Sequence, residues 1–319
     1  MAALQHAAAG HREESSDGSL APEAEVVFAT EAKDGLQITT NVYLVKVSMP
    51  GTPCFELKLQ DTNGKQALAE LPVQSSICLS QGACSVFKCT LPYHEVMLEL
   101  MDHILPGSES ICTLGHGLGE AAISWQSRLA ARGQSLKRLT AVDNCKQVLE
   151  LAQSLLCELP SSCTSSHTTS DFIEADALEF MAPLGAKATP AAVFDIIIVD
   201  IGICGVMNDD TSLLAPPPGF LEVSWLEAAT GRLKPGGALL INLLAASAEC
   251  LPAVVATAKE ATGRLPRTQA AVYTCKGTGH YPSDLNVLLA LQKPPSKQGF
   301  PAKITCETAL GAIVVGECA

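Results

Sequence analysis

The feature that most constrains the fold is an alternation of strand and helix patterns between residues 106 and 293. Seven short apolar segments read as strands, and most are separated by segments with helical periodicity. The segments DIIIVD and ALLINLL are continuous apolar runs, which are typical of parallel strands covered by helices on both faces. We therefore predict an α/β fold, a Rossmann-like doubly wound domain with a mostly parallel, seven-stranded sheet.

The rest of the chain divides around this domain. Residues 25–92 carry short β-branched stretches separated by turn signals such as Asp61-Thr62-Asn63-Gly64, which predict a small antiparallel β region. Residues 1–24 lack periodicity, and we expect a disordered leader. A helical pattern from residue 93 opens the main domain, which we place at 93–293. Residues 294–319 form a C-terminal extension, for which the pattern leaves a terminal helix and an added strand equally open.

Charge and cysteine content limit the partners and the compartment. The net charge of −12 disfavours nucleic-acid binding, which needs a cationic face, and is compatible with a basic protein partner or with simple solubility. The 13 cysteines form no C-x-x-C pair, so the simplest interpretation is unpaired thiols in a reducing compartment. No signal peptide and no run of about 18 apolar residues is found, so we expect a cytoplasmic protein that does not cross a membrane.

A glycine turn follows the first strand of the alternating region. In ICTLGHGLGEAAISW, the glycines Gly115, Gly117 and Gly119 lie where the strand becomes a helix. Such a turn brings backbone N–H groups and a helix N-terminus close to a ligand, although it also makes an ordinary tight connection. A dinucleotide fingerprint needs glycine where this chain has Glu120, and the Gly-Lys-Ser/Thr of a P-loop is absent.

Acidic residues follow the next three strands. Asp143 ends the second strand, Asp176 lies in EADAL at the end of the third, and Asp200 ends the fourth. Ligands of open α/β sheets bind at this edge, where a carboxylate such as Asp143 can accept ribose hydroxyls. Each aspartate alone could equally be a helix cap or a turn former. Their coincidence with the glycine turn predicts a nucleoside site.

These residues resemble a known family. The segments LGHGLG, AVD, EADAL, FDIIIVD and LKPGGALLIN resemble class I S-adenosylmethionine-dependent methyltransferases of the spermidine-synthase-like branch. The segment APPPGFLEVSWLEAATGRLKPGGALLINLL is most similar to the C-terminal half of the methyltransferase-like 13 family, which methylates lysine and N-terminal amines. YHEVML is similar to the Y-Q-E-M segment of aminopropyltransferases. The resemblance covers about residues 90–293.

The resemblance assigns a role to each position of the edge. Gly115, Gly117 and Gly119 would cradle the methionine part of S-adenosylmethionine, and Asp143 would hold the ribose. The remaining positions are Asp176 and Ala177, which would bracket the adenine, and Asp200, which would face the sulfonium and be the catalytic residue. For residues 25–92 the resemblance implies either a cover over the substrate cleft or a homodimer contact.

One departure concerns the acceptor. The family carries an Asp-x-Asp pair where this chain has Asp200-Ile201-Gly202, so the second carboxylate is missing. Polyamine synthases use such carboxylates to bind a cationic amine. The absence of the second one therefore weakens the aminopropyltransferase interpretation. Asp209 and Asp210 in the following loop could substitute for the missing group.

Other polar residues have weaker patterns. His280 and Tyr281 lie in a glycine-containing loop near the same edge. This loop could border the substrate site or be an ordinary exposed turn. His94 and His103 fall in a helical pattern and are better explained as structural histidines. No grouping has the spacing of a zinc site, so no metal is expected.

Three functions therefore remain. The first is methyl transfer to a protein amine, a lysine or an N-terminus, on a basic target. The second is a polyamine aminopropyltransferase, which would use decarboxylated S-adenosylmethionine. The third is a non-catalytic scaffold with the same fold.

Overall fold

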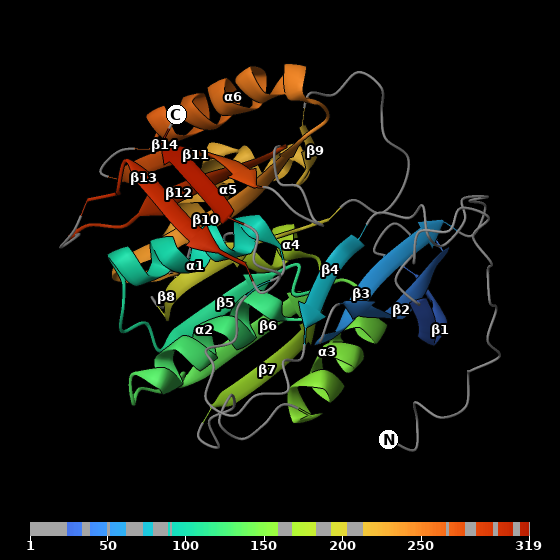
Figure 1. The fold of residues 1–319 in the computed structure, drawn as a ribbon. Coiled ribbons are helices and arrows are strands. Elements are labelled where there is room, and N and C mark those ends of the chain that lie inside the picture. The colour runs from blue at the N-terminus through green and yellow to red at the C-terminus, as the bar shows by residue number, and fades with distance from the viewer. Residues whose placement is uncertain are drawn as a thin grey trace.

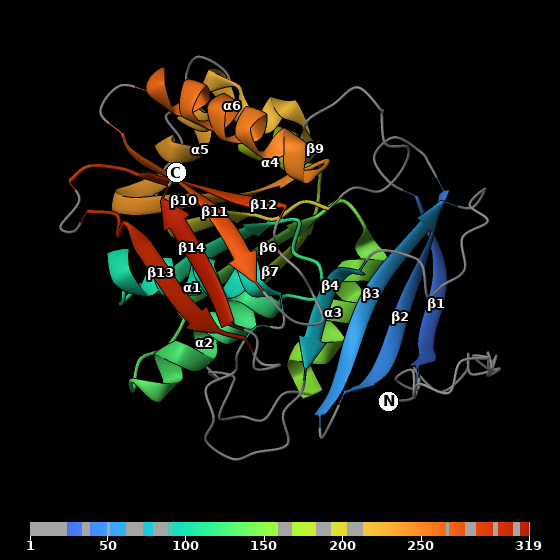
Figure 2. The ribbon, with the colours of Figure 1, turned by 45° about the horizontal axis from the view of Figure 1, so that its top comes forward.

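The computed structural model describes residues 24–33, 39–49, 52–61, 73–78, 89, 91–158, 168–182, 193–202, 213–265, 268–277, 285–295, 299–308 and 313–318. They form a four-stranded and a ten-stranded sheet, which lie side by side in Figures 1 and 2. Residues 1–23 of the expected leader lie outside the described residues, as do Asp209, Asp210, His280 and Tyr281. Within the described part of the chain, no helix is long and apolar enough to cross a membrane.

The N-terminal sheet is antiparallel throughout, as predicted for this region. Its strands follow one another in chain order: β1 (Ala24–Lys33), β2 (Thr39–Met49), β3 (Thr52–Asp61) and β4 (Val73–Cys78). Apolar side chains of this sheet share one cluster with side chains of two helices that cover the large sheet and of the turn before one of them. The cluster includes Val42, Leu44, Leu57 and Ile77 of the sheet, and Leu118, Ile123, Val148, Leu151 and Leu155.

The large sheet confirms the doubly wound prediction. All seven expected strands are present, in the order β11-β12-β10-β8-β5-β6-β7, and β12 is the one of these seven that runs against the others. Their continuous apolar runs are buried on both faces, as in Phe194–Val199. The bounds are β5 (Ser110–Leu114), β6 (Arg138–Asp143), β7 (Thr169–Glu174), β8 (Phe194–Val199), β10 (Leu233–Ala245), β11 (Gln269–Gly277) and β12 (Asn286–Gln292).

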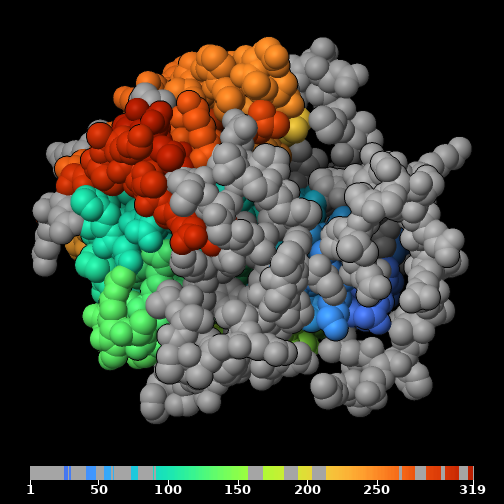
Figure 3. Space-filling model, in the orientation of Figure 1, coloured from blue at the N-terminus to red at the C-terminus, as the bar shows by residue number. Residues whose placement is uncertain are grey.

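Three further strands join the sheet beyond the seven expected. The short β9 (Leu213–Ala215) pairs with β10. The C-terminal extension forms two strands, β13 (Lys303–Glu307) and β14 (Ile313–Cys318), which resolves the choice between helix and strand. β14 pairs with β11, so these strands extend the sheet at the edge opposite β7. Figure 3 shows them on the side of the molecule away from the N-terminal sheet.

Helices cover both faces of the large sheet. One buried cluster joins the strands to α1 and α2, and a second joins them to α5 and α6. The amphipathic pattern of 93–105 corresponds to α1, which begins at Pro92, a residue suited to a first helical turn. The helices are α1 (Pro92–Ile104), α2 (Glu120–Ala131), α3 (Lys146–Glu158), α4 (Ala177–Met181), α5 (Val223–Gly231) and α6 (Leu251–Gly263), with 3₁₀ turns η3 (Pro218–Leu221) and η4 (Ala248–Cys250).

One cysteine departs from the expectation of unpaired thiols. Cys54, on β3, is disulfide-bonded, so that expectation is wrong at this residue. Its Cα partner across the β3–β4 ladder is Cys78. Free thiols among the other described cysteines include Cys89, Cys112, Cys250, Cys275 and Cys318.

Candidate functional site

The ends of four parallel strands are tied together at one edge of the large sheet. Backbone hydrogen bonds link each strand end, or the residue after it, to the neighbouring strand. This common edge holds the glycine turn, Asp143, Asp176 and Asp200, as the sequence predicted. The bonds are Asp200 N–H to Leu114 O (2.9 Å), Gly115 N–H to Val142 O (2.9 Å) and Ala175 N–H to Asp143 O (3.0 Å).

The glycine turn needs glycine at each predicted position. Gly115, Gly117 and Gly119 have φ of 74°, 54° and 81°, a region that side chains with a β-carbon rarely adopt. A β-carbon at Gly115 would lie 2.3 Å from the backbone oxygen of Asp200. One at Gly117 would lie 2.9 Å from the side chain of Ser75 on β4. The turn is therefore packed between β8 on one side and the N-terminal sheet on the other.

The last glycine of the turn precedes α2 directly. Gly119 is the N-cap of this helix, and its missing side chain leaves space for the ring of His116, 2.7 Å from an added β-carbon. His116 Nδ1 lies 2.7 Å from Oγ1 of Thr113. Burial lowers the pKa of His116 to about 4, so the ring is neutral. The first N–H groups of α2 have no partner within the helix and face the turn.

Asp143 reaches from the end of β6 to the glycine turn. Its Oδ2 accepts the N–H of Gly117 at 3.2 Å, and its Oδ1 accepts the N–H of Cys145 at 3.0 Å. Burial raises the pKa of Asp143 to about 6, and the surrounding backbone N–H groups oppose that rise. This carboxylate is therefore largely ionised at neutral pH and retains acceptor capacity beyond these two bonds.

Asp176 serves as a helix cap. β7 ends at Glu174, two residues earlier, and Asp176 Oδ1 accepts the N–H groups of Leu178 and Glu179 at 2.7 and 3.1 Å. Both bonds use Oδ1, so capping leaves the other oxygen of this exposed side chain for a ligand. The adjacent Ala177 is buried at the start of α4.

Asp200 is the centre of a polar network. Its Oδ2 accepts the hydroxyl of Tyr93 at 3.1 Å and lies 2.6 Å from Nε2 of His94. Its Oδ1 accepts Nδ2 of Asn242 on β10 at 2.9 Å. Asn242 in turn accepts Nδ2 of Asn286 on β12 at 2.9 Å. Side chains of three elements, α1, β10 and β12, thus fix the direction of this carboxylate.

His94 bridges two carboxylates. Its other ring nitrogen, Nδ1, lies 2.9 Å from Oε2 of Glu120, the first residue of α2. Burial alone would lower the pKa of His94, but the Asp200 and Glu120 carboxylates raise it to about 10. The ring is thus an imidazolium, and the three groups together carry one net negative charge. The Asp200 side chain is 18% exposed, against 6% for His94 and 0% for Glu120, so Asp200 is the most accessible member of the group.

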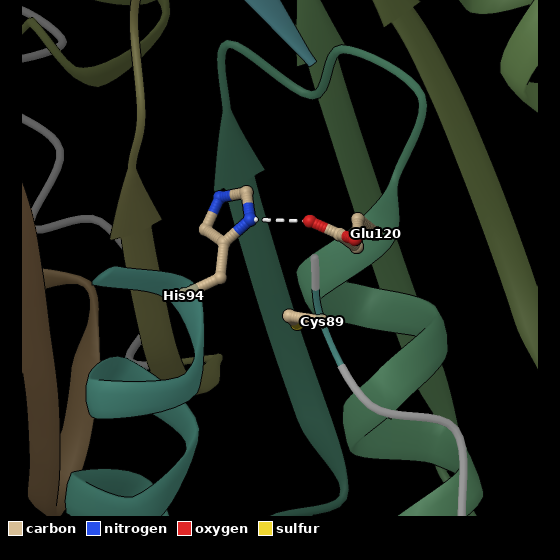
Figure 4. Close-up of side chains that lie close together, drawn as sticks. All are labelled: Cys89, His94 and Glu120. Atoms are coloured by element: carbon tan, nitrogen blue, oxygen red, sulfur yellow. Dashed lines mark hydrogen bonds and ion pairs between the residues drawn. The ribbon is translucent and has the colours of Figure 1, made fainter. Parts of the chain in front are cut away.

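A possible metal site at this position is better explained by hydrogen bonding. Donor atoms of Cys89, His94 and Glu120 lie within 4.8 Å of one another, and Figure 4 shows them between α1 and the start of α2. Burial, followed by the charge of Glu120, raises the pKa of the Cys89 thiol well above its usual value. Metals bind deprotonated thiol and neutral imidazole, so a metal would have to displace the protons that Cys89 and His94 hold in its absence. The absence of a metal remains a prediction.

Sequence reasoning placed the four strand ends but missed the groups around Asp200. The helical pattern predicts a structural histidine at His94, and its ring is indeed hydrogen-bonded, but to the two acidic residues Asp200 and Glu120. The Y-H-E segment that aligns with the family's Y-Q-E-M was the signal that could have identified Tyr93 and His94. No local pattern marks Asn242, which lies in the middle of an apolar strand.

No protein-family model matches the chain, and no curated protein matches it. Among solved structures, a probable spermidine synthase from Corynebacterium glutamicum is similar, at 17% identity and a TM-score of 0.50 over 83% of this chain and 80% of that chain. Human methyltransferase-like protein 13 in complex with SAH matches at 21% identity and a TM-score of 0.43, over 66% and 85% of the two chains.

A spermidine synthase from Thermotoga maritima matches at 11% identity and a TM-score of 0.45, over 87% of this chain and 83% of that chain. The Corynebacterium structure shows that this chain shares its fold. The 83% share exceeds what residues 92–319 alone could supply, so the similarity extends into the N-terminal part.

Proposed function

We propose that this protein is an S-adenosylmethionine-dependent methyltransferase that transfers a methyl group to a protein amine, a lysine side chain or an N-terminus. The observation that carries the proposal is the contact between the glycine turn and both flanking acidic residues. Gly117 donates its N–H to Asp143, and Gly115 packs against the backbone of Asp200. A nucleoside held by Asp143 would therefore lie at the same turn that packs against the backbone of Asp200.

The residues of the edge fit an adenosyl sulfonium ligand. The first N–H groups of α2, directly after the glycine turn, have no partner within the helix, and a carboxylate is favoured at such a helix N-terminus. Asp143 supplies acceptors for ribose hydroxyls, and Oδ2 of Asp176 with the N-terminal turn of α4 supplies contacts for an adenine. We propose these roles for Gly115, Gly117, Gly119, Asp143, Asp176 and Ala177.

Asp200 is the proposed catalytic residue. Bound S-adenosylmethionine would supply a methyl group on a sulfonium, which leaves readily once a nucleophile is aligned with it. The protein must orient an amine and remove its proton, because an amine at neutral pH is mostly ammonium. The net negative charge of Asp200, His94 and Glu120 attracts an ammonium, and the fixed Asp200 carboxylate offers it a hydrogen-bond acceptor.

The second candidate is a polyamine aminopropyltransferase. It is favoured by the shared fold with a probable spermidine synthase. The glycine at position 202 opposes it, because the second carboxylate of the Asp-x-Asp pair is absent. Decarboxylated S-adenosylmethionine lacks the carboxylate that the N-terminus of α2 would bind, so the two candidates differ in the nucleoside they prefer.

Two measurements test the proposal. Calorimetry compares S-adenosylmethionine with its decarboxylated form, and tighter binding of the first supports methyl transfer. Incubation with radiolabelled methyl donor and fractionated lysate then identifies the acceptor class, with label expected in protein. Label in polyamine, or a preference for the decarboxylated nucleoside, would favour the second candidate. Cofactor binding without any transfer would favour a scaffold.

The remaining expectations belong to the same proposal. The net charge of −12 suits a basic protein substrate and disfavours nucleic acid. We propose a cytoplasmic protein with a cofactor-binding domain at residues 93–293, an antiparallel β region at 25–92 and a C-terminal extension at 294–319. The role of the β region as a cleft cover or a homodimer contact is tested by the oligomeric state in solution.

A further inference from the structure

The acceptor side of the site includes a residue of the N-terminal sheet. Gly202 lies two residues beyond Asp200, and a β-carbon on it would be 2.1 Å from Oε1 of Gln74 and 3.3 Å from its Cδ. The Gln74 carboxamide therefore occupies the space into which any side chain at position 202 would begin to extend. That space is where the family resemblance places a second carboxylate.

A β-bulge aims Gln74 at this position. Across the β3–β4 ladder, Ser75 is opposite Leu57 and Val73 is opposite Lys58, so Gln74 is the extra residue of β4. Successive side chains of a regular strand point to opposite faces, and a bulge changes this direction. The bulge thus allows neighbouring residues of β4 to approach the same site.

Ser75 fixes the position of β4 against the cofactor side. Its Oγ accepts the backbone N–H of Leu118 at 3.1 Å, within the glycine turn. Both Ser75 and Leu118 are buried. In Figures 1 and 2, β4 is the strand of the small sheet that lies nearest to the large sheet. Gln74 is therefore held at a defined place between the glycine turn and Gly202.

The charge of this arrangement bears on the acceptor. The Gln74 carboxamide is neutral, and among the described residues no side-chain hydrogen bond involves it. Of the described side chains around Asp200, the linked group of Asp200, His94 and Glu120 then carries a single net negative charge. A diamine or polyamine carries two or more ammonium groups, and each needs its own acidic partner when it leaves water. A peptide amine carries one ammonium, and its neighbouring amides can bond to a carboxamide.

We infer that Gln74 is a specificity-determining residue, which takes the place of the second carboxylate beside Gly202 and selects a single peptide amine over a polyamine. The inference rests on the proposed function and specifies its substrate class. It also assigns the N-terminal sheet a direct part in the site.

The test is a titration of putrescine into the full-length protein by calorimetry, with and without saturating S-adenosylhomocysteine. Gln74→Glu keeps the shape of the side chain and restores a carboxylate, so we expect putrescine affinity to rise at least tenfold over the unchanged chain. The matched control is Gln153→Glu, the same charge change on the exposed face of α3, which should stay within twofold. Equal affinities for the two variants would overturn the inference.

A second pair of variants tests the same inference if Gln74→Glu fails to fold. Gly202→Asp alone should gain little, because Gln74 fills the space that the new side chain needs. Gly202→Asp combined with Gln74→Ala should bind putrescine at least tenfold more tightly than Gly202→Asp alone. No difference between them would contradict the assignment of Gln74. Failure of the unchanged chain to bind S-adenosylhomocysteine would instead count against the proposed function, and the comparisons without nucleoside would still decide the role of Gln74.

Discussion

Nε2 of His94 lies 2.6 Å from Oδ2 of Asp200, although the two residues are 106 positions apart in the chain. The contact joins the first turn of α1 to the end of β8, and Glu120 completes it from the start of α2. A protonated ring between two carboxylates orients Asp200 without cancelling the negative charge of the group. This relationship gives the first prediction.

We expect the stability of the protein to depend on pH through His94. Its pKa rises from 6.5 to about 10 on folding, so its contribution is fully present below pH 6.5 and is lost as pH rises through 10. The free energy of unfolding should therefore fall between pH 6.5 and 10, and His94→Gln should remove most of this dependence. His103→Gln, an exposed histidine of the same helix, is the control. Parallel urea curves for all three proteins would contradict the assignment.

Cofactor affinity should weaken in mild acid because of Asp143. Its pKa of about 6 in the free protein means that the carboxyl gains a proton below that pH and loses an acceptor for ribose hydroxyls. Calorimetry from pH 8 to pH 5 should show the affinity for S-adenosylhomocysteine falling through about pH 6. Asp143→Asn should bind weakly at every pH with the same circular dichroism spectrum. A variant that binds as tightly as the unchanged chain removes Asp143 from the site.

Substitution of Asp200 should separate binding from transfer. Asp200→Asn keeps the shape of the side chain and removes the charge opposite His94. We expect cofactor affinity to stay within a few-fold, while the rate of methyl transfer falls by about 10²-fold or more, as on loss of a group that moves a proton. Single-turnover transfer with saturating cofactor measures this, and full retained turnover would exclude the proposed role.

Gly117→Ala should affect both stability and binding. A left-handed backbone costs a residue with a β-carbon about 1–2 kcal/mol, and here the new methyl group also meets Ser75. Gly133→Ala is a matched control, since Gly133 has φ of 70° with no atom within 4 Å of the added carbon. Both variants should lose about 1 kcal/mol or more in urea unfolding. Cofactor affinity should fall in the first variant and stay unchanged in the second.

The ion pairs between α1 and the end of α2 predict that substitutions of Arg128 and Arg132 lower the stability by different amounts. Arg128 bonds to the buried Glu95 and is 9% exposed, whereas Arg132 bonds to Asp102 and is 40% exposed. Arg128→Ala leaves a buried carboxylate unpaired and should cost about 3–5 kcal/mol. Arg132→Ala should cost less than about 1 kcal/mol. Equal losses in chemical denaturation would show that burial does not control these pairs.

The sequence was sufficient to predict the features that have a local pattern along the chain. Continuous apolar strands, the glycine turn and the acidic residues after each strand are local patterns, and they predicted the sheet and the edge that holds Asp143 and Asp200. The prediction was less accurate where propensity allowed two interpretations. Asp176 caps α4 two residues beyond β7, and the C-terminal extension adds a pair of strands where helix and strand were equally open.

The environment of Asp200 could not be derived in the same way. Tyr93, His94 and Asn242 come from α1 and β10, and their meeting depends on how these elements pack in space. The approach of Gln74 to Gly202 depends on a bulge in β4 and on the docking of two sheets. Neither the groups around Asp200 nor the approach of Gln74 to Gly202 can be predicted from a repeating pattern, because contacts between segments far apart in the chain produce no regular spacing in the sequence.

The apolar cluster between the small sheet and the helices has a practical consequence for truncation. A fragment starting at α1 would expose Leu118, Ile123, Val148 and Leu151 to water. Such a patch promotes association of the fragment with itself. Removal of the first 90 residues would therefore yield a product that self-associates. The truncation would also remove Ser75, whose hydroxyl accepts the N–H of Leu118 in the glycine turn.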